Sequence, residues 1–162
     1  MRMIPGIAAI ALALAACSSR ASEGAAESTA SAVAARHPVS GLAVIPLTVT
    51  HAGKAHAFRV ELARTSYEQA KGLMFRTEMG ADEGMIFPME PPRDASFWMK
   101  NTVIPLDIIF IGTDRRILNV AANTVPYSED PVQSLGTTSA VLELNAGRAA
   151  QLGIVAGDKV QW

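Results

Sequence analysis

The sequence has a single cysteine, Cys17, and only three histidines among its 162 residues. A lone cysteine cannot form a disulfide within the chain, and so few thiols and imidazoles leave no zinc framework of the usual spacing. Charge of one sign is also scarce, because 14 Lys and Arg face 15 Asp and Glu, for a net charge of −1. This balance argues against the concentrated basic surface of a nucleic-acid-binding protein. We therefore expect no nucleic-acid partner and no cofactor.

The first residues contain an apolar run from Ile4 to Ala16, which follows the basic Arg2. The run has the length of a signal-peptide core and is too short to span a bilayer as a helix. Leu14-Ala-Ala-Cys17 resembles the lipobox of bacterial lipoproteins, in which the thiol is acylated by diacylglycerol and the chain is cut just before the cysteine. Residues 1–16 are thus predicted to be a signal peptide and Cys17 the lipidation site. The alternative is an ordinary secretory signal with a chance cysteine.

The expected location is the cell envelope, with the membrane as a partner through the N-terminal lipid. Ser18 follows the cysteine, where an Asp commonly retains lipoproteins at the inner membrane of Gram-negative cells. If the source is Gram-negative, the periplasmic face of the outer membrane is therefore the predicted address.

Residues 18–40 consist mainly of small and polar side chains, which cannot bury enough apolar surface to offset the entropy of ordering them. We expect residues 17–40 to form a lipidated, flexible tether. The remaining residues, 41–162, are ample for a single domain with its own core.

The domain is predicted to be mainly β. Phe58, Val60 and Leu62 alternate with polar residues, whereas Leu106 to Ile111 is almost entirely apolar and suits a central strand. Thr65 and Glu68 have the spacing of a capping box at the start of a helix. We expect a small barrel-like domain of about seven short strands with two short helices.

Several motifs occur in a distinctive order. These are Lys71-Gly-Leu-Met-Phe-Arg76, Gly84-Met-Ile-Phe87, Phe97-Trp-Met-Lys-Asn-Thr102, Pro105-Leu-Asp107 and Val141-Leu-Glu-Leu144. Together they resemble the domain-of-unknown-function 192 family over residues 42–162. The resemblance implies a compact, β-rich, barrel-like domain, often behind a signal peptide or lipobox. It implies no established activity.

Two carboxylates interrupt apolar strands, Asp107 and Glu143. A buried carboxylate must be paired, hydrogen-bonded or protonated, and Lys100 and Arg76 are the natural partners of Asp107, with backbone donors as the other choice. One interpretation is a structural ion pair that fixes strand register. The other is catalytic, because two carboxylates at a suitable separation can act as acid and base in a hydrolase.

A ligand site is the leading functional hypothesis. Trp98 offers an indole on which a sugar or another polar ring could stack, and a cation and an amide lie next to it in the sequence. The predicted site for a small polar or carbohydrate ligand comprises Arg76, Trp98, Lys100, Asn101 and Asp107. A hydrolase that uses Asp107 and Glu143 is one alternative.

Methionines supply a third hypothesis. Thioethers are soft ligands for Cu(I), and Met74, Met85 and Met99 are the candidate ligands of such a metal site, although scattered methionines usually fill gaps in a core. A purely structural or partner-binding module is the fourth possibility.

Overall fold

The computed structural model describes residues 35–162, which form a single compact unit. The expected signal peptide, Cys17 and most of the expected tether lie outside the described residues. Within residues 35–162, no helix is long and apolar enough to cross a membrane. The structural findings therefore concern the β-rich domain.

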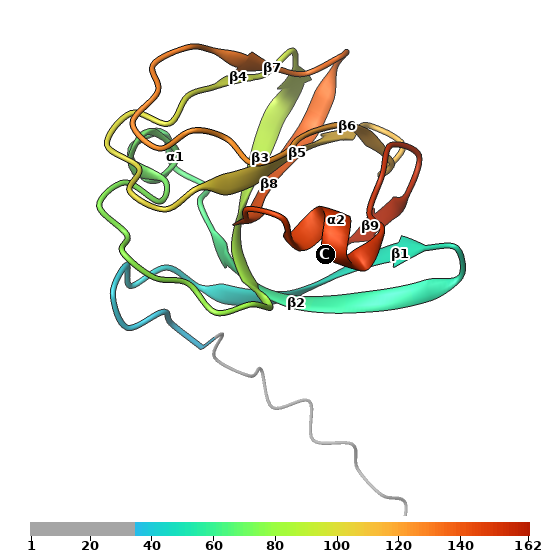
Figure 1. The fold of residues 1–162 in the computed structure, drawn as a ribbon, viewed down its shortest axis with the longest axis horizontal. Coiled ribbons are helices and arrows are strands. Elements are labelled where there is room, and N and C mark those ends of the chain that lie inside the picture. Colours follow the sequence, from blue (N-terminus) through green and yellow to red (C-terminus); the bar gives the residue numbers. More distant parts are fainter. Residues whose placement is uncertain (1–34) are drawn as a thin grey trace, which may run out of the picture. The chain divides into compact units, whose positions relative to one another are not determined.

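The described domain contains nine strands and two short helices (Figure 1). In chain order they are β1 (Val44–His51), β2 (Lys54–Leu62), α1 (Ser66–Lys71), β3 (Glu83–Arg93), β4 (Ser96–Phe97), β5 (Leu106–Gly112), β6 (Ile117–Ala121), β7 (Val132–Gln133), β8 (Thr138–Asn145), α2 (Arg148–Leu152) and β9 (Lys159–Gln161). The mainly β class with two short helices is confirmed. The strands number more than the seven or so expected, because several short pairings escape a sequence pattern.

Seven strands form one sheet in the order β6-β5-β8-β3-β2-β1-β9, and β4 pairs with β7 in a separate ribbon. The barrel-like expectation holds only loosely, since the sheet does not close into a continuous ladder. Its two edges meet at one isolated β-bridge, in which Arg116, just before β6, pairs with Lys159 of β9. The hydrogen bond from the Ile117 amide to the Asp158 carbonyl, 2.9 Å long, supports this meeting of the edges.

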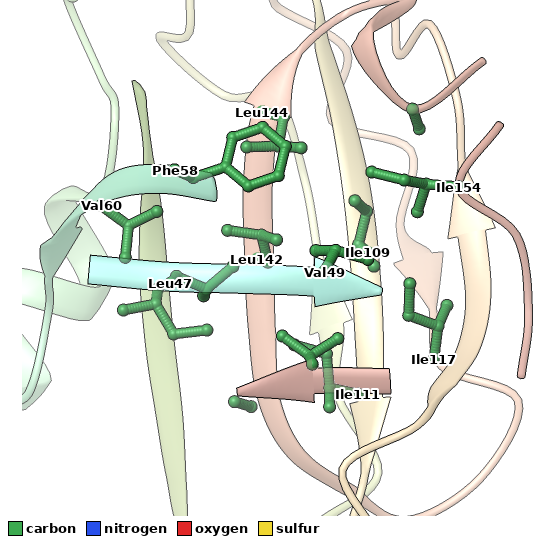
Figure 2. Close-up of a cluster of buried hydrophobic side chains, with 14 of the residues drawn as sticks. Leu47, Val49, Phe58, Val60, Ile109, Ile111, Ile117, Leu142, Leu144 and Ile154 are labelled. Carbon is green, nitrogen blue, oxygen red and sulfur yellow. The ribbon is translucent and has the colours of Figure 1, made fainter. Parts of the chain in front are cut away.

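The sheet separates two apolar clusters, and β5, which lies between β6 and β8, is buried along its whole length. On β5, Ile109 and Ile111 belong to the first cluster, whereas Ile108 and Phe110 belong to the second. The first cluster gathers side chains from β1, β2, β5 and β8 around Leu142 (Figure 2). Alternate residues of one strand thus serve two cores, which explains why the sequence of β5 is almost uniformly apolar.

α2 and the turn after α1 contribute to different clusters. Ala149 of α2 packs in the first cluster, and Leu73, just after α1, packs in the second. The predicted capping box of α1 is confirmed: the Thr65 hydroxyl accepts from the Glu68 amide, and the Glu68 carboxylate accepts from the Thr65 amide at 2.8 Å. α1 lies on the crossover between β2 and β3, which are parallel neighbours.

β3 carries three prolines even though it lies between two neighbours. Its pairing with β2 ends at Ile86, and Pro88, Pro91 and Pro92 all follow that point. The pairing with β8 also shifts register between Pro88 and Arg93. Proline lacks the amide that a ladder needs, so it is tolerated where one edge of the strand is free.

Residues 36–40, which the sequence placed in the tether, pack on the domain. Arg36 forms an isolated antiparallel β-bridge with Ala43, and the Ser40 hydroxyl donates a hydrogen bond to the carboxylate of Glu61. His37 Nε2 lies 3.7 Å from the same carboxylate. The folded part of the chain therefore begins before residue 41.

Candidate functional site

A pocket of about 360 Å³ opens between α1, β3 and β4. Its apolar lining includes the aromatic side chains Phe87, Phe97 and Trp98. Phe87 and Phe97 meet edge to face, with ring centroids 5.2 Å apart. Such aromatic walls with a few polar groups are typical of small-molecule sites.

Glu143 of β8 is the polar group of most interest in this pocket. The residue is 5% exposed and lines the cavity, and its strand neighbours are Met85 on β3 and Ile108 on β5. No described residue donates a hydrogen bond to its carboxyl group. Removal from water disfavours the charged form, so burial raises the pKa of Glu143 from 4.5 to about 8. At neutral pH the pocket therefore contains a carboxylic acid that carries a proton.

Other charged side chains of the pocket are exposed to solvent. Lys71, Arg93 and Asp94 line it, and all three are exposed. Gln69 also lines it, but its amide donates to the carbonyls of Ala63 and Pro88, which ties α1 to β3. Glu143 thus has no charged neighbour at the buried part of the pocket among the described lining residues.

Asp107 lies elsewhere and has a structural role. It is fully buried, and its carboxylate accepts from the amides of Asn123 at 2.9 Å, Gly147 at 3.0 Å and Ala149 at 2.9 Å. Gly147 is the N-cap of α2 and has no side chain to cap the helix. Asp107 supplies that cap from β5, where a carboxylate suits the exposed amides of a helix N-terminus. Of the partners expected for Asp107, the backbone donors are present, and neither Lys100 nor Arg76 is hydrogen-bonded to its carboxylate.

The sheet register separates the two carboxylates proposed for a hydrolase. Asp107 stands opposite Leu144, whereas Glu143 stands opposite Ile108. Paired residues share a face, and Leu144 and Ile108 belong to different clusters. Asp107 and Glu143 therefore point to opposite faces of the sheet and cannot act as a pair on one substrate.

Arg76 is committed to another carboxylate. Its guanidinium makes a bidentate ion pair with Glu61 of β2, at 2.8 Å and 3.1 Å, and both side chains are buried. This pair ties the loop after α1 to the sheet. Arg76 is therefore not a free ligand-binding cation in this structure.

Trp98 and Lys100 are close together, as expected, just after the short strand β4. The Lys100 ammonium lies 5.1 Å from the Trp98 ring centroid and 3.5 Å from a Glu129 oxygen. Trp98 is 49% exposed and lines the pocket. Asn101 turns away, with its amide 3.8 Å from the Met74 sulfur. Of the five predicted binding residues, Trp98 alone lines the pocket that contains Glu143.

The methionines belong to the second apolar cluster. Met85 and Met99 are buried there, and the Met99 sulfur accepts from the Thr124 hydroxyl at 3.1 Å. Met74 lines the pocket, with the Asn101 amide near its sulfur. Within residues 35–162 no group of three or more His, Cys, Asp or Glu is placed to bind a metal ion. The sulfurs of Met74 and Met99 thus already face polar hydrogens, which favours packing over metal binding.

Sequence reasoning missed the pocket itself. Phe87 and Phe97 belong to motifs that the sequence singled out, but their convergence depends on a crossover and a separate ribbon. The usable signal was Glu143, a carboxylate between two leucines. Its neighbours along the strand could not show which face it occupied.

Comparisons with known proteins agree with the fold. A crystal structure of a protein of unknown function from Novosphingobium aromaticivorans DSM 12444 is 64% identical over 82% of this chain and 94% of that chain, with a TM-score of 0.79. A crystal structure of a "putative transcription regulator" from Sinorhizobium meliloti 1021 is 39% identical over 74% of this chain and 94% of that chain, with a TM-score of 0.72. No curated protein matches the chain. The pattern of the DUF192 family, described as "Uncharacterized ACR", matches residues 47–162, so the chain belongs to the DUF192 family, whose function is unknown.

Proposed function

We propose that this domain binds a small polar ligand, with a carbohydrate as the best candidate, in the pocket between α1, β3 and β4. The observation that carries the proposal is Glu143, a carboxyl group with no hydrogen-bond donor among the described residues in the wall of an open cavity. The Glu143 oxygens are not among the fully buried unpaired atoms of the described residues, so they are open to the cavity, where a ligand would supply a hydrogen-bond partner. Because the acid is protonated at neutral pH, it suits a ligand with a neutral acceptor such as a hydroxyl or carbonyl oxygen.

Trp98 supports the choice of a ring-shaped ligand. Its half-exposed indole lies on the rim of the same pocket, beside the Lys100 ammonium. An indole face packs against the apolar side of a sugar ring while the hydroxyls of the sugar reach polar groups. In this arrangement the ligand stacks at the rim and hydrogen-bonds to Glu143 inside.

The test is a thermal-shift screen with a panel of monosaccharides and disaccharides, N-acetylated members included. A specific ligand at about 100 times its Kd stabilises the folded state by about 2.7 kcal/mol, which raises the Tm by several degrees. We expect Glu143→Gln to keep the shift, because the amide still donates, and Glu143→Ala and Trp98→Ala to lose it. An equal shift in all four proteins would place the ligand elsewhere, and no shift with any sugar would count against a carbohydrate.

Proton transfer is the second candidate function, favoured by the raised pKa of Glu143. A general acid must hold its proton at the working pH, and a buried glutamate with a pKa of about 8 does so. The Glu143→Gln variant separates the two functions, because it would retain binding and lose turnover if Glu143 is a catalytic acid. The pair of Asp107 and Glu143 is not proposed, since the two lie on opposite faces.

Lipid anchoring of the chain through Cys17 is the other part of the proposal, supported by the Leu-Ala-Ala-Cys sequence that ends its apolar leader. Cys17→Ser removes the thiol to which diacylglycerol would be attached. We expect the variant to leave the membrane fraction or to persist as an uncut precursor. Mass spectrometry of the N-terminal peptide and membrane fractionation measure both effects, and an unchanged mature mass in the membrane fraction would defeat the proposal.

The transcription role attributed to the Sinorhizobium meliloti protein is not proposed for this chain. The net charge of this chain, −1, gives no support for DNA as its partner.

A further inference from the structure

A second hollow of about 210 Å³ lies beside the pocket that contains Glu143, which we call the ligand pocket. Exposed apolar side chains border this second hollow. Val39, Tyr67 and Phe75 line it and are 75%, 76% and 68% exposed. They come from the N-terminal segment, from α1 and from the loop after α1. We call this hollow the apolar groove. Three large apolar side chains that converge on one concave surface differ from the single exposed apolar residues of an ordinary surface.

The backbone holds Phe75 in this exposed position. Its φ is +63°, in the left-handed region that bulky residues rarely adopt, and its amide donates to the Asn101 carbonyl at 2.9 Å. Tyr127 shows the same combination: its φ is +62°, it is 60% exposed, and its amide donates a hydrogen bond to the Thr102 carbonyl. The strain at these aromatic residues is offset by the bonds to residues 101 and 102. Such strain is typical of functional surfaces.

Two observations place the apolar groove at a particular end of the domain. Lys71, Gly72 and Met74 line both the apolar groove and the ligand pocket, so the two hollows are neighbours. The N-terminal segment of the described domain also passes here, because Val39, four residues after the first described residue Ala35, lines the groove, while Arg36 and His37 line another hollow. Residues 18–34 can span at most about 60 Å when fully extended.

We infer that the apolar groove is the surface through which the domain rests on the lipid bilayer that holds Cys17. The inference rests on the proposed lipid anchor. Aromatic side chains suit the boundary between headgroups and acyl chains, since one part of each is apolar and another tolerates water. Three side chains bind a bilayer weakly alone, but a tether raises their effective concentration at the surface. The ligand pocket next to the groove would then open beside the membrane.

The test uses the lipidated chain in dilute vesicles of phosphatidylethanolamine and phosphatidylglycerol. Acylation consumes the only thiol of the chain, so an introduced cysteine is the single site for a polarity-sensitive fluorophore. Lys71→Cys places the label in the groove without removing an apolar side chain. Val155→Cys is the matched control, because Val155 is 51% exposed and lies between α2 and β9.

We expect both proteins to float with the vesicles, but only the label at residue 71 to shift to shorter wavelength and to resist aqueous iodide. Adding Tyr67→Ser and Phe75→Asn should abolish the shift while flotation persists; asparagine tolerates the left-handed backbone at residue 75. Flotation with identical spectra at residues 71 and 155 would overturn the docking inference alone. A shift that requires a high protein density would assign the groove to a second copy and also overturn it. Failure to float would defeat the anchor and the inference together, while the sugar screen would still test the pocket.

Discussion

Replacing Glu143 with glutamine should stabilise the domain at pH 8 by an amount on the order of 4 kcal/mol and should change its stability little at pH 4. The cause is the burial of the carboxyl group, which raises its pKa from 4.5 to about 8. Glutamine is close in shape and carries no charge at any pH. It therefore removes the cost of protonating this carboxyl group on folding at a pH where the unfolded chain holds it ionised.

The sign of the pH dependence of stability follows from the protonation of Glu143 in the folded and unfolded states. Between about pH 4.5 and pH 8 the unfolded chain has released the proton of Glu143 and the folded domain has not. The free energy of unfolding of the wild type therefore falls as pH rises through this window, and it levels off above the folded pKa. Glu143→Gln should lack this part of the decline.

Urea denaturation at several pH values, followed by circular dichroism, measures the effect. Glu78→Gln is the matched control, because Glu78 is exposed and its replacement should change stability by less than about 0.5 kcal/mol. Parallel curves for wild type and Glu143→Gln from pH 4 to pH 8 would show that the Glu143 carboxyl is solvated. The proposed site would then lose its main support. If Glu143→Gln is more stable than the wild type, still binds the sugar and has lost turnover, then the wild type sacrifices stability for catalysis at this position.

Replacing Asp107 with alanine should have the opposite effect and destabilise the domain by about 3 kcal/mol at neutral pH. Three backbone amides, those of Asn123, Gly147 and Ala149, donate to this side chain in a fully buried position. Alanine leaves all three without this acceptor. The Ala149 amide is buried and the other two are partly buried, and an unpaired buried amide costs about 1–3 kcal/mol. The helix cap of α2 is lost in the same step.

The matched control is Asp114→Ala. The Asp114 carboxylate also accepts a hydrogen bond from a backbone amide, that of Arg116 at 3.0 Å, but it lies in an exposed turn. We expect its cost to be about 1 kcal/mol or less, because water can replace the lost acceptor. Asp107→Asn should fall between wild type and Asp107→Ala, as one acceptor oxygen remains. Wild-type stability of Asp107→Ala in urea denaturation would refute the capping role. Loss of sugar binding in a stably folded Asp107→Asn would return Asp107 to the site.

The amino-acid sequence by itself determined the local features of this protein. Neighbouring residues suffice to predict the capping box of Thr65 and Glu68, the buried strand from Leu106 to Ile111 and the mainly β class, and the motif order indicates the family. These features depend on side chains a few positions apart, whose spacing is fixed by the backbone geometry of a strand or a helix turn.

Tertiary structure alone decided the roles of the two buried carboxylates. Asp107 and Glu143 look alike in the sequence, each within an apolar strand. In the fold, Asp107 accepts from two amides at the start of α2 and from a loop amide, whereas Glu143 lines a pocket. Strand register assigns each to a face of the sheet, and a shift of one residue would exchange them. That register is set by contacts among β3, β5 and β8, which lie far apart in the chain. The position of a carboxylate, and hence its pKa and its chemistry, could be read only from the folded sheet.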